Sequence, residues 1–197
     1  MNYLIYDVSG HRAVTNWKAP FMDTFNWPRI LHISWILLDE NLKPIADYNA
    51  YAEQPELRVG EEMLGSVHLE AEEYEANKTD IKLIMQRFAE DIEKADYVFS
   101  FNQEYNENIA GAEFLRTGVK HTLFKKENFC LMRESTYYCA LPGKGGKFKW
   151  PTLNELHAVL FQQKYTPSGN ARADVIAAAR CFIKLKKLGE LEDLFEG

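Results

Sequence analysis

The segment "NYLIYDVSGHR", residues 2–12, places one aspartate between an apolar run and a glycine-containing turn. Leu4, Ile5 and Tyr6 predict a short buried strand over residues 3–8 that brings Asp7 to its end. A carboxylate beside a buried strand needs a partner, because an isolated charge is costly to remove from water. We therefore expect other segments of the chain to supply the partner of Asp7.

The rest of the chain alternates strand-like and helix-like patterns, separated by turns. Further strands are expected at residues 29–40, 45–52 and 96–101, and helices at residues 77–95, 104–118, 130–140, 152–161 and 170–188. Residues 11–28 are irregular and aromatic, which predicts a folded loop. This order predicts an α/β fold with a mixed β-sheet flanked by α-helices, in a single domain over residues 1–197.

Composition limits the class of protein. With 46% apolar and 26% charged residues, the 197-residue chain has the composition of a soluble globular protein. No apolar stretch approaches the ~18–20 residues that span a bilayer, so we expect no membrane association. Three scattered cysteines favour free thiols and a cytoplasmic location. The net charge of −6 argues against a broad cationic face that holds nucleic acid.

Polar residues that could carry chemistry gather at the ends of predicted elements. Asp7 follows the first strand, and Asp174 lies near the start of the last helix. A third group, Asn102, Tyr105 and Asn106, lies where the 96–101 strand meets its helix. Strand ends and helix N-termini are where α/β folds place ligand-binding groups, so we expect these residues to form a site.

Several stretches, in order, resemble the DnaQ-like (DEDD) 3′–5′ exonuclease family, which includes enzymes of the DNA polymerase III epsilon type. They are "YLIYD", "WPRILHISWILLDENLKPI", "DYVFSFNQEYNENIAGAEFLRTG", "KWPTLNELHAVLF" and "GNARADVIAAARCF", and they extend over nearly the whole chain. The resemblance implies a ribonuclease-H-like fold. It also implies a mechanism in which four carboxylates hold two divalent ions and a histidine or tyrosine acts as general base.

The sequence departs from the family's pattern at three of five catalytic positions. Asp7 and Asp174 match the family's aspartates, and they are the candidate metal ligands. Ser9 stands where the family has glutamate, Asn106 where it has aspartate, and Gly169 where it has histidine. The partner of Asp7, which is a glutamate two residues further along the strand in the family, is therefore predicted to be Ser9.

Loss of two carboxylates predicts weak metal binding. Each unit-charge interaction at ~4 Å is worth roughly 4 kcal/mol at an effective dielectric constant near 20. We therefore expect Mg²⁺ or Mn²⁺ to bind weakly or not at all, and catalysis to be impaired. One alternative is a weakly active metal-dependent 3′–5′ exonuclease that uses Asp7 and Asp174 with a substitute such as Glu104, Glu107 or His11.

Other residues suit contact with single-stranded nucleic acid. Asn102 and Tyr105 match the second motif of the family, and Lys144, Lys147 and Lys149 alternate with aromatic residues in "GKGGKFKW". Lysines beside aromatic rings are suited to phosphate contact and base stacking. The main hypothesis is thus an exonuclease-fold protein retained for binding nucleic acid or a protein partner. A further alternative is a purely regulatory pseudoenzyme that binds only protein.

Overall fold

The computed structural model describes residues 1–166 and 169–195, which form a six-stranded sheet with strand order β4-β3-β2-β1-β5-β6. β1, β2 and β3 form an antiparallel meander, β5 and β6 run parallel to β1, and β4 runs parallel to β3. The strands are β1 (Tyr3–Gly10), β2 (Ile30–Leu38), β3 (Pro44–Glu53), β4 (Thr79–Asp80), β5 (Tyr97–Ser100) and β6 (Glu127–Cys130).

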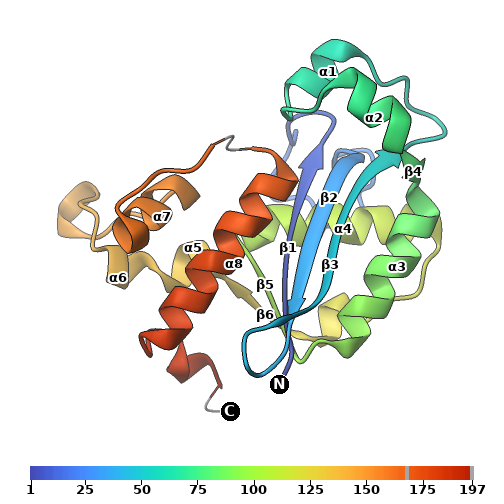
Figure 1. Cartoon of the computed structure of the whole chain (residues 1–197). Helices are drawn as coiled ribbons and strands as arrows, with labels where there is room; N and C mark the ends of the chain where they lie inside the picture. Colours follow the sequence, from blue (N-terminus) through green and yellow to red (C-terminus); the bar gives the residue numbers. More distant parts are fainter. Residues whose placement is uncertain (167–168, 196–197) are drawn as a thin grey trace.

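Helices cover both faces of this mixed sheet, as predicted. Figure 1 shows α8 crossing one face, with α3 and α4 on the opposite side. The α-helices are α1 (Glu61–Gly65), α2 (Ala71–Asn77), α3 (Ile81–Lys94), α4 (Gln103–Thr117), α5 (Leu131–Glu134), α6 (Thr136–Cys139), α7 (Leu153–Phe161) and α8 (Ala171–Lys187). Short 3₁₀ turns occupy Leu123–Lys125, Lys144–Gly146 and Glu192–Phe195. None of the helices formed by the described residues is long and apolar enough to span a bilayer.

The alternation of side chains along β1 divides the core into two layers. Leu4 and Tyr6 are fully buried in the layer shared with α3 and α4, whereas Ile5 is buried against α8. Because successive side chains point to opposite faces, Asp7 shares the α8 face with Ile5. The strand continues to Gly10, so the prediction that Asp7 ends it was wrong: Asp7 pairs with Ser34 inside the β1–β2 ladder.

Three local predictions differ from the structure. The helix expected over residues 130–140 is two four-residue helices, α5 and α6, and β6 precedes them unpredicted. Four residues are too few to display a period, and β6 is specified by its pairing with β5. The helix expected from residue 77 begins at Ile81, because the Asp80 carboxylate accepts hydrogen bonds from the Lys82 and Leu83 amides at 2.8 and 3.3 Å.

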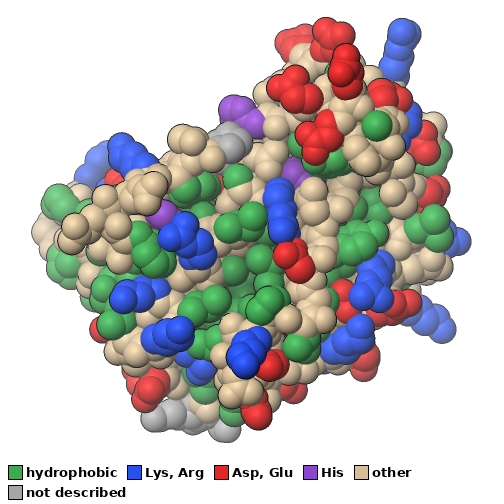
Figure 2. All heavy atoms as spheres, viewed as in Figure 1, with side chains coloured by type: hydrophobic (Ala, Val, Ile, Leu, Met, Phe, Trp, Pro, Cys, Tyr) green, Lys and Arg blue, Asp and Glu red, His purple; other side chains and the backbone are tan. Residues whose placement is uncertain are grey.

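The negative charge of the chain is concentrated around α1 and α2. Residues 53–77 contain eight glutamates and one arginine, a net charge of −7, while the other 172 residues contain 21 acidic and 22 basic side chains. Figure 2 shows acidic side chains gathered over these two helices, at the top of the molecule. The net charge of −6 therefore arises from residues 53–77, which we call the acidic lobe, and the rest of the chain is close to neutral.

Candidate functional site

All five positions that match the catalytic positions of the exonuclease family line one cleft. This sheet-end cleft has a volume of about 1200 Å³, and its walls come from β1, α1, the first turn of α4 and the segments that precede α7 and α8. The five lining residues are Asp7, Ser9, Asn106, Gly169 and Asp174. The structure thus assembles residues that are 167 positions apart in the sequence.

Asn106 provides the partner of Asp7, so the prediction of Ser9 was wrong: the Ser9 hydroxyl donates to the Gly169 carbonyl oxygen instead. Its Nδ2 donates to Asp7 Oδ1 at 3.1 Å and to the Phe101 carbonyl oxygen at 2.9 Å. Its Oδ1 accepts from the Val8 backbone N–H at 2.8 Å, and the residue is only 1% exposed. These contacts fix the orientation of the amide. In the inverted orientation, the amino group would face the Val8 N–H, donor against donor, and Oδ1 would face the Phe101 carbonyl oxygen, acceptor against acceptor. The amino group of Asn106 therefore faces the carboxylate.

The Asp174 carboxylate is also held by donors of the protein. Its Oδ1 accepts from the Tyr165 hydroxyl at 2.7 Å, and its Oδ2 accepts from the Gly169 N–H at 2.9 Å. Ser9 completes the contact, since its hydroxyl donates to the Gly169 carbonyl oxygen at 3.3 Å. Gly169 has a φ of +91°, a conformation that L side chains rarely adopt. The backbone of Gly169 therefore connects Ser9 to Asp174.

Electrostatics in the cleft favour a reduced negative charge. Burial, followed by the Asp174 carboxylate, raises the pKa of Asp7 well above its usual range, although the Asn106 hydrogen bond lowers it. Burial also raises the pKa of Asp174, against the hydrogen bonds from Tyr165 and Gly169. Burial therefore disfavours the charged form of both carboxyl groups, and the Asp174 charge adds to this effect at Asp7.

These residues do not fit a two-metal centre. Divalent Mg²⁺ requires several oxygen ligands, and carboxylates are the strongest. Here Asn106 presents an N–H donor to Asp7 in place of an oxygen ligand, and both oxygens of Asp174 already accept hydrogen bonds. Among the described residues, no group of three or more His, Cys, Asp or Glu side chains could hold a metal ion. A weak single Mg²⁺ or Mn²⁺ site at Asp7 and Asp174 stays a prediction.

Two of the predicted nucleic-acid contacts, Asn102 and Tyr105, line the sheet-end cleft. Asn102 has a left-handed backbone with φ of +60° and makes no side-chain hydrogen bond to cap α4. The ring of Tyr105 packs 5.9 Å from that of Trp17, and burial raises the pKa of the phenol. A raised phenol pKa does not suit a general base, whereas the exposed edge of Tyr105 can contact a ligand.

The predicted lysines lie outside the lining of this cleft. Lys149 pairs with Glu155 at 2.5 Å, and Glu155 in turn belongs to the capping box of α7 with Thr152. The aromatic partner of these lysines, Trp150, does line the cleft and is 56% exposed. Nucleic-acid contact by Lys144, Lys147 and Lys149 therefore remains a prediction for the rim.

Among the cleft residues that sequence reasoning missed, Arg12, Arg58 and Tyr165 carry polar groups suited to a ligand. Neither arginine pairs with a carboxylate within the part of the chain that the structure describes. Arg12 could have been predicted from the sequence, because it lies just beyond the end of β1, where the strand opens into the cleft. The proposed substitutes Glu104 and Glu107 are not among the lining residues, and Glu104 pairs with Arg133 at 3.6 Å.

No model of a known protein family matches the sequence, and no curated protein matches it. Solved structures of exonuclease I do match in fold. One structure of exonuclease I, which suggests how processivity is achieved, aligns with this chain at a TM-score of 0.72 and 13% sequence identity. The alignment covers 98% of this chain and 43% of the exonuclease I chain. E. coli exonuclease I in complex with a dT13 oligonucleotide aligns at 0.71 with 14% identity, over 99% and 42%.

The enzyme from Methylocaldum szegediense gives a TM-score of 0.67 with 14% identity, over 94% of this chain and 40% of the other. The fold is therefore ribonuclease-H-like, as the sequence predicted, and it is the fold of the exonucleases. Exonuclease I is one of the proteins that this chain resembles in structure. At 12–15% identity this likeness concerns the fold alone, and the chain spans about two fifths of the length of these structures.

Proposed function

We propose that this chain is an exonuclease-fold protein that no longer hydrolyses phosphodiesters and binds single-stranded nucleic acid in the sheet-end cleft. The observation that carries the proposal is the hydrogen bond of 3.1 Å from Asn106 to Asp7. An amide donor occupies the place where catalysis would need a cation. We also propose a cytoplasmic location, since the cysteines are buried free thiols.

Retention of strand binding is supported by the walls of the cleft. Trp150 offers an exposed ring for base stacking, and Arg12 and Arg58 offer cations for phosphates. The cleft also contains Glu62, Asp7 and Asp174, which offset the positive charges of Arg12 and Arg58. Binding would therefore depend more on stacking than on counterion release. E. coli exonuclease I has been solved with dT13 and with dA16, which supports the choice of ligand.

The test of lost hydrolysis uses 5′-labelled single-stranded DNA and RNA with Mg²⁺ or Mn²⁺. The Asp7→Ala/Asp174→Ala variant is the control for a contaminating nuclease. We expect no shortening with either protein. Shortening from the 3′ end that the control abolishes would contradict the proposal and establish the weakly active exonuclease instead.

The test of binding is fluorescence anisotropy with a labelled dT oligonucleotide. Trp150→Ala removes the ring in the cleft, and Tyr137→Ala is the matched control, because Tyr137 is 83% exposed and does not line the cleft. Loss of one stacked base costs about 1–3 kcal/mol, so we expect roughly 5- to 150-fold weaker binding for Trp150→Ala only. Equal affinities for the two variants would contradict binding in this cleft.

A second candidate function is supported by the acidic lobe. Its net charge of −7 lies beside the cleft, where it would repel a nucleic acid strand and attract a basic protein surface. If the native chain binds no oligonucleotide, this alternative, a pseudoenzyme that binds only protein, becomes the better account. Its test is salt-dependent association with a basic protein that is weakened by glutamine substitutions in residues 70–75.

A further inference from the structure

A second pocket of about 650 Å³ lies on the other side of the 11–28 loop. His11 and Arg12 line both this pocket and the sheet-end cleft, so the two hollows meet at these residues. Three further cations line the second pocket, Arg29, Lys82 and Arg116, and we call it the arginine pocket.

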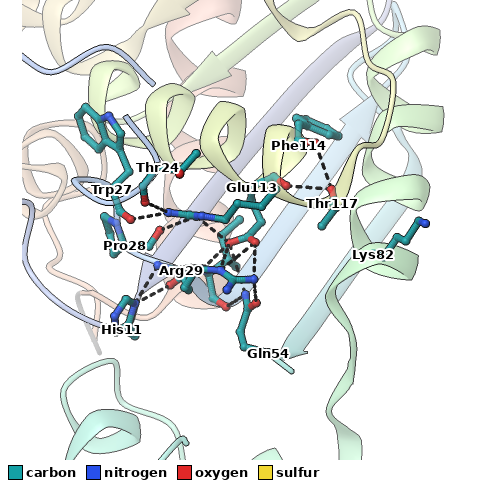
Figure 3. Close-up of polar contacts among 12 residues, drawn as sticks. His11, Thr24, Trp27, Pro28, Arg29, Gln54, Lys82, Glu113, Phe114 and Thr117 are labelled. Carbon is teal, nitrogen blue, oxygen red and sulfur yellow. Dashed lines mark hydrogen bonds and ion pairs between the residues drawn. The ribbon is translucent and has the colours of Figure 1, made fainter. Parts of the chain in front are cut away.

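The arginine pocket is built on a buried charge network, shown in Figure 3. Glu113 of α4 is fully buried and accepts from Arg29 Nε at 3.1 Å and from Arg116 Nη1 at 3.2 Å. It also accepts from the Ile30 backbone N–H at 3.1 Å. One carboxylate therefore serves two arginines, and the network retains a positive charge that no buried acid balances.

Hydrogen bonds to the 11–28 loop and to the residue that follows β3 fix the geometry of these cations. Arg116 Nη2 donates to the Trp27 carbonyl oxygen at 2.7 Å, and Arg29 Nη2 donates to Gln54. Within the described residues, Arg29 Nη1 donates no hydrogen bond, so this group is available to a ligand. Burial and the positive charges of Arg29 and Arg12 lower the pKa of Arg116, although Glu113 opposes this effect. A bound anion would relieve that repulsion.

Two carboxylates face the same pocket and limit its positive charge. Asp80 lines it, but its oxygen is occupied by the N-terminal amides of α3. Glu56 also lines it and is exposed. Figure 3 places Lys82 apart from the network, on α3, where its charge can act on a ligand from the rim.

We infer that the arginine pocket binds a phosphate group, with Arg29 Nη1 as its donor. Arg12, whose guanidinium donates to Ala13, Thr15 and Phe25, adds a second fixed positive charge. Guanidinium groups present paired N–H donors that match phosphate oxygens. Since His11 and Arg12 also line the sheet-end cleft, the phosphate is a phosphodiester of the strand held there. This last step rests on the proposed function, whereas phosphate binding by itself does not.

Two measurements test separately whether the arginine pocket binds phosphate and whether a nucleic acid strand passes through it. The first measurement is the rise in melting temperature of the native chain with inorganic phosphate, at constant ionic strength maintained with chloride. The variants change charges that only the arginine pocket contains: Lys82→Gln removes a cation, and Glu56→Gln removes an acid. Their matched controls, Lys43→Gln and Glu61→Gln, lie outside the lining of both hollows.

We expect Lys82→Gln to weaken phosphate binding about threefold and Glu56→Gln to strengthen it about threefold, the scale of one exposed charge interaction. Both controls should match the native chain. Absence of any phosphate-dependent shift, or equal behaviour of all four variants, would overturn the phosphate site.

The second measurement is the salt dependence of dT oligonucleotide binding. Loss of one full phosphate contact reduces the magnitude of the slope of log K against log salt by about 0.7. Because Lys82 acts from the rim, we expect Lys82→Gln to reduce the slope by part of this amount and Lys43→Gln to leave it unchanged. An unchanged slope would overturn the path of the strand through the arginine pocket. If phosphate binds and no oligonucleotide does, the proposed function fails while the phosphate site stands.

Discussion

Asn106→Asp tests whether the amide has replaced a metal ion as the partner of Asp7. The substitution changes one donor group into a carboxylate of nearly the same shape. It retains the acceptor for the Val8 N–H, removes the donor to the Phe101 carbonyl, and places a second acid about where Nδ2 now lies, 3.1 Å from Asp7 Oδ1.

The cost follows from these contacts. Two ionised carboxylates at ~4 Å repel by about 4 kcal/mol at an effective dielectric constant near 20. One of them can take up a proton instead, which limits the cost to about 1.4 kcal/mol for each pH unit between the raised pKa and the working pH. Loss of the hydrogen bond to Phe101 adds about 1 kcal/mol. We therefore expect Asn106→Asp to lose about 2–4 kcal/mol of stability at pH 7 without metal.

The assay is urea unfolding at pH 4.5 and pH 7.5, in EDTA and in millimolar Mn²⁺. Carboxyl groups with raised folded-state pKa values contribute most below their unfolded pKa near 4, and this stability is lost as the pH rises. The deficit should therefore be larger at pH 7.5 than at pH 4.5, and Mn²⁺ should restore stability in the variant alone. Asn108→Asp is the matched control, because Asn108 lies two residues away in an exposed hydrogen bond. An Asn106→Asp chain as stable as this control in EDTA at pH 7.5 would refute the reasoning.

Three further predictions concern stability. Burial and Asp174 raise the pKa of Asp7, so Asp7→Asn should be more stable than the native chain at pH 7.5 and lose this advantage near pH 4; lower stability at pH 7.5 would contradict this. Gly10→Ala should cost about 1–3 kcal/mol in urea unfolding, because a Cβ would lie 2.7 Å from Pro28 Cγ; an unchanged midpoint would show that Pro28 can move. Glu113→Gln should cost about 3–5 kcal/mol, because it leaves Arg29 and Arg116 without their buried counter-charge; a loss below 1 kcal/mol would mean that water replaces it.

The fold could be predicted from sequence where the local pattern and the tertiary structure agree. β1 alternates between two core layers over eight residues, and α8 presents an apolar stripe over 17 residues. The short elements could not be predicted, because β6 depends on pairing with β5, and α1 and α2 are only five and seven residues long. Their stability comes from contacts that no local window contains.

The sequence could predict which residues form the candidate site, but not how their side chains are oriented. Motif order placed Asp7, Asn106 and Asp174 in one cleft, and the structure brings them together. The orientation of the Asn106 amide depends on the Val8 N–H and the Phe101 carbonyl, which lie on different elements. Side-chain hydrogen bonds across such distances leave no periodic signal in the sequence.

The three substituted positions act as a set, since each favours a cleft without metal. Asn106 donates to Asp7, and the Gly169 backbone donates to Asp174 and accepts from Ser9. A histidine at position 169 would have to adopt a φ of +91°, which costs about 1–3 kcal/mol for residues other than glycine. A glutamate at position 9, which is only 5% exposed, would add a third acid without a donor. Reversing one substitution alone is therefore expected to destabilise the chain before it adds a metal ligand. If the proposed loss of hydrolysis is correct, activity would return only when several positions change together.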